Sequence, residues 1–140
     1  MQRNVPILLV EDDDVDVENV VRAFDESRIT NPLSVARNGE EALGLLRADA
    51  SNCRRMPGLI LLDINMPVMN GFELLAILKQ DPTFRTIPVV ILTTSQEESD
   101  RYRSFQLSVA GYMIKPVEFT DFVEVVQTID RYWSMSELGA

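Results

Sequence analysis

Five short apolar runs, separated by segments with helical patterns, constrain the fold of this chain most strongly. The runs are Ile7 to Val10, Leu33 to Ala36, Leu59 to Leu62, Val89 to Leu92 and Tyr112 to Ile114. The first, third and fourth are almost continuously apolar, as strands are when helices cover both faces of a parallel sheet. Strands and helices that alternate in this way predict an α/β fold, a doubly wound parallel sheet of the (βα)5 type.

Apolar residues between these runs recur at helical spacing, which predicts helices with one face on the sheet. The stripes are Val17, Val20, Val21 and Phe24; Leu74, Leu75 and Leu78; and Phe119, Phe122, Val123, Val126, Ile129 and Trp133. With 140 residues the chain has room for one domain, residues 1–140, in which 134–140 form a C-terminal tail.

Composition excludes several classes of function. The net charge of −9, with scattered arginines, argues against nucleic acid as a direct partner. The chain has no histidine, which excludes an imidazole base and a phosphohistidine of its own. No apolar run approaches the roughly 20 residues of a membrane span, and no secretory leader is apparent. We therefore expect a cytoplasmic protein without a membrane partner.

Acidic residues follow the first predicted strand, at the sheet edge where doubly wound proteins bind ligands. Asp13 and Asp14 are explained by capping of the following helix and by its dipole. Glu11 and Asp12 precede that helix. They would repel a third carboxylate on a neighbouring strand unless a cation lay between them.

The third carboxylate is Asp63, directly after the buried third run. In isolation it is equally well explained as a cap for the loop that follows. Together with Glu11, Asp12 and a backbone carbonyl of that loop, it would supply the hard oxygen ligands that suit Mg²⁺.

The remaining strand ends supply a hydroxyl and an ammonium. Thr93 and Thr94 follow the fourth run, and Lys115 ends the fifth. Only two of the thirteen basic residues are lysines, which indicates that a compact charge is required at position 115. Pro116 leaves open a cis peptide that would aim Lys115 into the cleft. A carboxylate nucleophile, a metal site, a hydroxyl and an ammonium are the equipment of phosphoryl transfer.

These segments resemble the receiver domains of two-component response regulators. The matching motifs are V-E-D-D at 10–13, L-L-D-I-N-M-P-x-M-N-G at 61–71, I-L-T-T-S at 91–95 and G-Y-M-I-K-P at 111–116. The resemblance implies a flavodoxin-like fold with strand order 2-1-3-4-5. It also implies that Asp63 is the phosphoacceptor. Asp12, Asp63 and the Asn65 carbonyl would bind Mg²⁺, or Mn²⁺ in its place, and Glu11 would act through metal-bound water.

The same resemblance implies a switch. Lys115 would contact the phosphoryl group, the Thr93 hydroxyl would move onto it, and Tyr112 would rotate inward at the same time. Thr94 is bulkier than the small residue usual at its position, which affects access to the phosphoryl group. The fourth helix, fifth strand and fifth helix would then present a changed surface.

A narrower similarity is to the single-domain regulators that serve bacterial phytochrome kinases. It rests on the long segment 50–58, the L-T-T-S stretch and the ending T-I-D-R-Y-W-S-M-S-E-L. It implies a stand-alone response regulator, phosphorylated on Asp63 by a sensor histidine kinase that is a bacterial phytochrome.

The last predicted helix has more apolar surface than one sheet can cover. Val125, Tyr132 and Trp133 are expected to extend toward another face or beyond the sheet edge, which predicts a homodimer through the C-terminal face. In the alternative arrangement, Trp133 folds back on its own domain.

Two other functions fit this architecture less well. An aspartate-nucleophile phosphatase needs a second acid two residues after the nucleophile, where Asn65 stands. A flavodoxin-type flavin module needs a hydroxyl- or glycine-rich loop after the first strand, where the acids 11–14 would repel phosphate. We therefore expect a phosphoacceptor signalling protein, not an enzyme with a separate substrate.

Overall fold

Strands and helices alternate along the whole of the described chain. The computed structural model describes residues 5–52, 54–66 and 68–135, and of residues 133–135 it describes the backbone alone. The strands are β1 (Ile7–Val10), β2 (Leu33–Ala36), β3 (Leu59–Leu62), β4 (Val89–Thr93) and β5 (Gly111–Ile114). The helices are α1 (Asp14–Glu26), α2 (Gly39–Ser51), α3 (Gly71–Gln80), α4 (Glu98–Gln106) and α5 (Phe119–Met135). Each predicted strand is present.

The boundaries differ slightly from those predicted. β4 and β5 each gain one residue, because Thr93 pairs with Ile114 and Gly111 pairs with Val90 in the parallel ladder. Helix α5 continues to Met135 and so includes the first residues of the segment 134–140 that was expected to be a tail. The extent of the domain stays a prediction.

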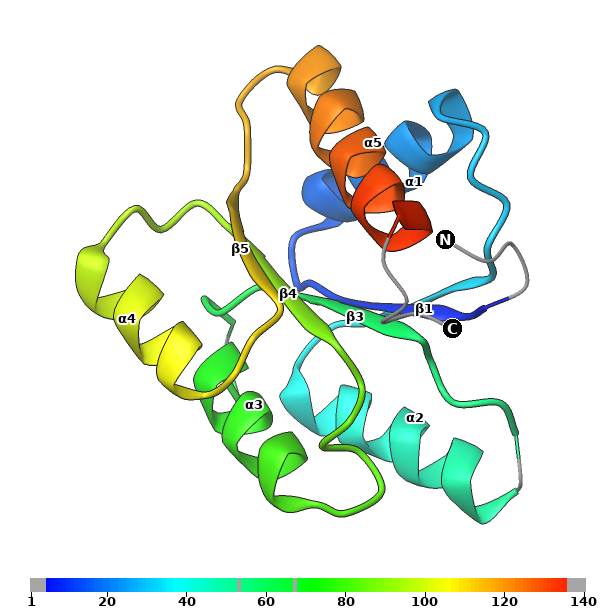
Figure 1. Ribbon diagram of the computed structural model, residues 1–140, viewed down its shortest axis with the longest axis vertical. Coiled ribbons are helices and arrows are strands. Elements are labelled where there is room, and N and C mark those ends of the chain that lie inside the picture. The colour runs from blue at the N-terminus through cyan, green and yellow to red at the C-terminus, as the bar shows by residue number, and fades with distance from the viewer. Residues whose placement is uncertain (1–4, 53, 67, 136–140) are drawn as a thin grey trace.

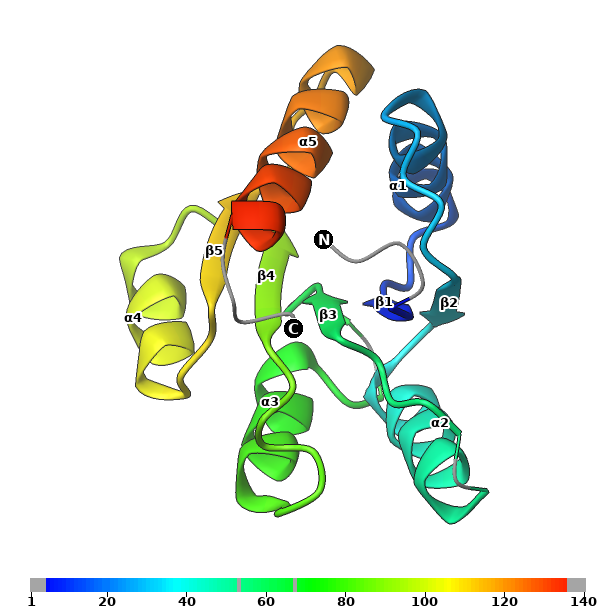
Figure 2. The same cartoon turned by 45° about the vertical axis from the view of Figure 1, so that its right-hand side comes forward.

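The five strands form one parallel sheet in the order β2-β1-β3-β4-β5. Helices α1 and α5 cover one face, and α2, α3 and α4 cover the other (Figures 1 and 2). The predicted flavodoxin-like fold and strand order are therefore confirmed. The strand order reverses between β1 and β3, and the crevice beyond their carboxyl ends is where such sheets bind ligands.

Burial follows the predicted pattern, with two exceptions. Every residue of β1, β3 and β4 is buried, as expected for strands covered on both faces. Val21 was expected in the buried stripe of α1 but is 45% exposed, because the buried face of that helix includes Ala23 and is turned away from Val21. Val125 does not extend beyond the sheet but packs, partly buried, against the core shared by α1 and α5.

None of the helices within the described ranges combines the length and the apolar character that a membrane crossing requires.

Gly71 begins α3 where that helix meets the end of β3. A Cβ at this position would lie 2.6 Å from both the Asp63 carbonyl oxygen and the Ile64 Cα, which are backbone atoms that cannot easily move. We expect Gly71→Ala to destabilise the protein by about 1–3 kcal/mol through overpacking. Gly44→Ala is the matched control, because no atom outside its own helical surroundings lies within 4 Å of that Cβ. It should stabilise α2 by about 0.5–1 kcal/mol. Urea unfolding measures both changes, and equal stability of the two variants would contradict the expectation.

Candidate functional site

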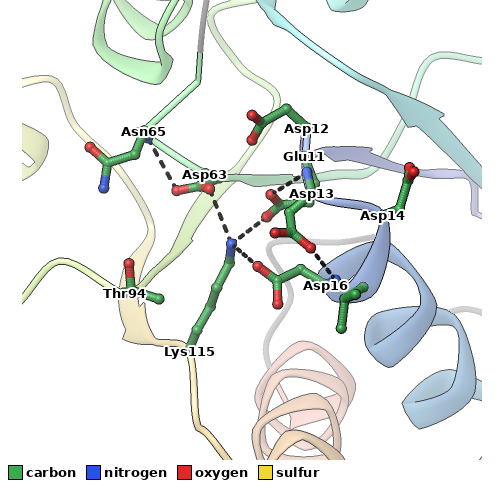
Figure 3. A pocket seen from close by; sticks show the side chains of 10 residues that line it. Glu11, Asp12, Asp13, Asp14, Asp16, Asp63, Asn65, Thr94 and Lys115 are labelled. Atoms are coloured by element: carbon green, nitrogen blue, oxygen red, sulfur yellow. Dashed lines mark hydrogen bonds and ion pairs between the residues drawn. The ribbon is translucent and has the colours of Figure 1, made fainter.

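One acidic pocket lies at the carboxyl ends of the strands and has a volume of about 630 Å³ (Figure 3). Its lining residues are Glu11, Asp12, Asp13, Asp14, Val15, Asp16, Asp63, Asn65, Thr94 and Lys115. The structure thus brings together six of the predicted site residues, from the ends of four strands. Thr93 and Tyr112, which were also predicted, are not among the residues that line this pocket.

Lys115 reaches into the centre of the pocket (Figure 3). Its Nζ lies 2.5 Å from Glu11 Oε2, 2.8 Å from Asp16 Oδ2 and 3.0 Å from Asp63 Oδ2. Burial opposes the charge of the ammonium, but the hydrogen bonds to Asp16 and Glu11 and the charge of Asp63 outweigh burial and raise the pKa of Lys115. The lysine therefore stays charged. The cis peptide considered for Lys115 and Pro116 does not occur, since the described residues contain no cis peptide bond.

Three carboxylates in this pocket are arranged to hold a cation. Glu11, Asp12 and Asp63 each offer an oxygen, and these oxygens all lie within 4.8 Å of one another. Together with Asp16, they bring four carboxyl groups to a pocket in which Lys115 is the single basic residue of the lining. An all-oxygen donor set with excess negative charge suits a hard divalent cation. The residues present therefore fit the predicted metal site.

Asp63 is one of the two buried carboxylates of this group, with Glu11. It is 6% exposed, directly after β3. The Asn65 backbone N–H donates a hydrogen bond to Asp63 Oδ1 at 3.2 Å, and Lys115 Nζ contacts the other oxygen. The carboxylate is thus held from both sides. Asn65 itself is exposed, and a metal-binding role for its carbonyl oxygen stays a prediction.

The two predicted switch residues are linked through Ser95. Thr93 is fully buried, and its Oγ1 accepts hydrogen bonds from Ser95 N at 3.3 Å and from Asn65 Nδ2 at 3.5 Å. Tyr112 is half-buried in β5, and its hydroxyl donates to the Ser95 carbonyl at 2.9 Å. Thr94 is exposed at the pocket. Thr93 and Tyr112 are therefore both hydrogen-bonded to the same loop residue.

Sequence reasoning did not assign a role to Asp16. Acids in a first helical turn are usually explained by the helix dipole. This explanation accounts for Asp16 without its specific contact with Lys115. The local pattern of acids after β1 gives no signal for this contact, because Asp12 precedes α1 and therefore shares no helical face with Asp16. The partner Lys115 is 99 residues away in sequence, so the pattern could not identify it. The predicted capping role of Asp13 is confirmed, since its side chain accepts from Asp16 N at 3.0 Å.

Metal binding should depend on pH through Glu11. Burial is the main cause that raises the pKa of Glu11 to about 7, and the Asp63 charge adds to it, while Lys115 opposes it. Below that pH the carboxyl group is protonated and disfavours a cation, so Mg²⁺ affinity is expected to rise as pH increases through about 7. Calorimetric titrations at several pH values measure this. Glu11→Gln should remove the pH dependence of Mg²⁺ affinity in this range. If the affinity of the variant still changed with pH as in wild type, a group other than Glu11 would be responsible.

Residues 7–127 match the family profile of the response regulator receiver domain. The response regulator Rcp1 of Synechocystis sp. (strain ATCC 27184 / PCC 6803 / Kazusa) is 40% identical over 129 residues, covering 91% of this chain and 87% of Rcp1. FilR2, a probable methanogenesis regulatory protein of Methanothrix harundinacea, is 38% identical over 127 residues, covering 91% of this chain and 82% of FilR2.

Solved structures agree with these sequence relatives. The phosphorylated cyanobacterial phytochrome response regulator RcpA superposes with a TM-score of 0.85 at 37% identity, and the match covers 94% of each chain. The Mn²⁺-bound form of Rcp1 superposes with a TM-score of 0.82 at 38% identity, covering 92% of this chain and 94% of Rcp1. The family match includes all five strands, and the relatives are about 40% identical over most of the chain. Phytochrome response regulators are among the structural neighbours. Together these findings show that the chain belongs to the response regulator receiver domains, a family of signalling proteins.

Proposed function

We propose that this protein accepts a phosphoryl group on Asp63 from a sensor histidine kinase, in a Mg²⁺-dependent reaction in the cytoplasm. The observation that carries the proposal is the buried Asp63 carboxylate, 3.0 Å from Lys115 Nζ within a cluster of further carboxylates. The protein catalyses only its own phosphorylation and dephosphorylation. Asn65, two residues after Asp63, cannot act as the acid that a separate phosphomonoester substrate would need.

Transfer forms one bond and breaks one bond. An Asp63 oxygen attacks phosphorus in line, the P–N bond of the donor's phosphohistidine breaks, and the imidazole leaves with the bonding electrons. The product is an acyl phosphate on Asp63. The Asn65 N–H orients the attacking carboxylate, and Lys115 donates hydrogen bonds to the phosphoryl oxygens.

The cation would be held by Asp12, Asp63 and the Asn65 carbonyl oxygen, and Glu11 would act through water. When bound, it would neutralise negative charge on the phosphoryl oxygens.

The phosphoryl group acts as a switch because it offers Thr93 a new hydrogen-bond acceptor. To donate to it, the Thr93 hydroxyl moves away from Ser95 N, and Tyr112 then rotates into the vacated space. A contact made only in the phosphorylated state shifts the population of the two states. The surface of α4, β5 and α5 changes with them and transmits the signal.

We propose a bacterial phytochrome as the kinase, which the similarity to the phytochrome response regulator RcpA supports. FilR2, which is named for methanogenesis, has a comparable identity, so the donor has to be tested directly. Phosphotransfer from a panel of histidine kinases of the source organism, phytochromes included, to wild type and Asp63→Asn is the experiment. Rapid transfer from a phytochrome to wild type alone is expected. Preferred transfer from a different kinase would replace the proposed donor, and absence of transfer from every kinase would contradict the function.

We also propose a homodimer through the C-terminal face, which comprises β5 and the end of α5. β5 is an edge strand of half-buried residues, and Tyr132 is 50% exposed beside it. A cavity of about 250 Å³ lies between them, lined by Tyr112, Thr128 and Tyr132 among others. The Trp133 side chain lies outside the described residues. Sedimentation at micromolar concentration should give a wild-type dimer and a monomeric Tyr132→Ala, Trp133→Ala variant. A monomeric wild type would refute the dimer.

A further inference from the structure

Asp16 connects the first turn of α1 to the end of β5. Its Oδ2 accepts a hydrogen bond from Lys115 Nζ at 2.8 Å. The Asp16 side chain is 25% exposed, against 2% for Glu11 and 7% for Asp63. Asp16 is therefore, of the three carboxylates around Lys115, the one most open to solvent.

Helix capping does not explain where this carboxylate lies. Asp16 stands three residues after the N-cap Asp13, the position from which an acid bonds back to the N-cap N–H in a capping box. Here the Asp13 N–H donates instead to Glu11 Oε1 at 3.1 Å (Figure 3). The Asp16 carboxylate is consequently available to Lys115.

We propose that Asp16 is a positioning residue that holds Lys115 in a resting arrangement and thereby slows phosphoryl transfer to Asp63. The inference rests on the proposed function. An ammonium has three N–H donors, and three carboxylates lie within 3.0 Å of this one. An incoming phosphoryl group needs at least one of these donors, so it competes with Asp16 for Lys115.

Removal of the Asp16 charge has two opposing effects. The lysine loses one contact, which would loosen it and slow transfer. However, the Lys115 side chain is only 4% exposed, and Glu11 still holds its Nζ at 2.5 Å, so the ammonium keeps its place. The neutral amide oxygen of the variant also holds one N–H donor of Lys115 less tightly than the carboxylate does, so that donor is more readily given to a phosphoryl oxygen. The second effect is the larger one, and transfer becomes faster.

The test compares the phosphorylation rates of wild type, Asp16→Asn and Glu18→Gln. Asparagine keeps the shape of the side chain without its charge, and Glu18→Gln removes the same charge from an exposed position of α1. Each protein is incubated with acetyl phosphate at saturating Mg²⁺, and intact mass follows the label. Asp16→Asn is expected to be phosphorylated about three- to ten-fold faster than wild type, which corresponds to the weakening of one partly exposed charge interaction. Glu18→Gln should keep the wild-type rate.

A second comparison determines whether Asp16 acts through the ammonium. In a Lys115→Met background, Asp16→Asn should change the rate by less than about two-fold, because no ammonium remains to be released. Equal acceleration in both backgrounds would overturn the inference, as would an Asp16→Asn rate at or below that of wild type. If Lys115→Met does not fold, the inference is tested by the phosphorylation rates of Asp16→Asn and Glu18→Gln alone. If wild type is labelled on Asp63 but Asp16→Asn is not labelled faster, only this inference is overturned. If wild type takes up no phosphoryl group, the proposed function is overturned as well.

Discussion

Asp63→Asn is expected to abolish uptake of a phosphoryl group while leaving the fold intact. Asparagine keeps the shape of the side chain, but its amide is a poor nucleophile and cannot form an acyl phosphate. It also removes one of the carboxylates clustered around Lys115, which lessens their mutual repulsion. Intact mass after incubation with acetyl phosphate and Mg²⁺ measures the effect. Wild type should gain the mass of one phosphoryl group, and the variant should gain none.

Asp121→Asn is the matched control for this substitution. It makes the same chemical change at an exposed carboxylate in the first turn of α5. This variant should be labelled like wild type. Full labelling of Asp63→Asn would instead move the acceptor to another residue of the chain.

Asp12→Ala is expected to abolish Mg²⁺ binding and to slow phosphorylation more than about ten-fold, because a bound metal contributes several kcal/mol of charge stabilisation. Asp12 is exposed, so its truncation should leave no cavity in the core. Its carboxylate nevertheless lies with Glu11 and Asp63 in the group whose oxygens approach within 4.8 Å. Calorimetry measures the affinity directly.

A neighbouring acid separates metal ligation from a general loss of negative charge. Asp14 lines the same pocket, but its side chain pairs with Arg37. Asp14→Ala should therefore weaken Mg²⁺ binding only slightly. If Asp12→Ala and Asp14→Ala lowered the affinity equally, Asp12 would not be a direct ligand.

The sheet could be predicted because its strands carry an unambiguous signal. Buried parallel strands appear in a sequence as apolar runs. β1 and β3 have the same first and last residues as the apolar runs that predicted them. Helical faces are less certain, because an apolar residue at the edge of a stripe, such as Val21, is exposed or buried according to how the helix is rotated on the sheet. The strand order followed only from the resemblance to a known family.

The candidate site could be predicted where residues follow strand ends. Glu11, Asp63 and Lys115 each lie at the end of a strand, and parallel strands bring those ends to one edge of the sheet. The contact of Asp16 with Lys115 could not be predicted, because it depends on how α1 is placed relative to the end of β5. Periodicity describes one element at a time and contains no information on such a pairing.

Chemical trapping of the phosphorylated residue tests most directly whether Asp63 is the acceptor. Borohydride reduces an acyl phosphate to an alcohol, which converts a phosphorylated aspartate to homoserine. The protein is phosphorylated with acetyl phosphate and Mg²⁺, reduced, digested and mapped by tandem mass spectrometry. Homoserine at position 63, present with Mg²⁺ and absent when the metal is chelated, is the predicted result. Homoserine at Asp12 or Asp16, or a stable phosphate on Thr93 or Thr94, would contradict the assignment of Asp63 as the phosphoacceptor.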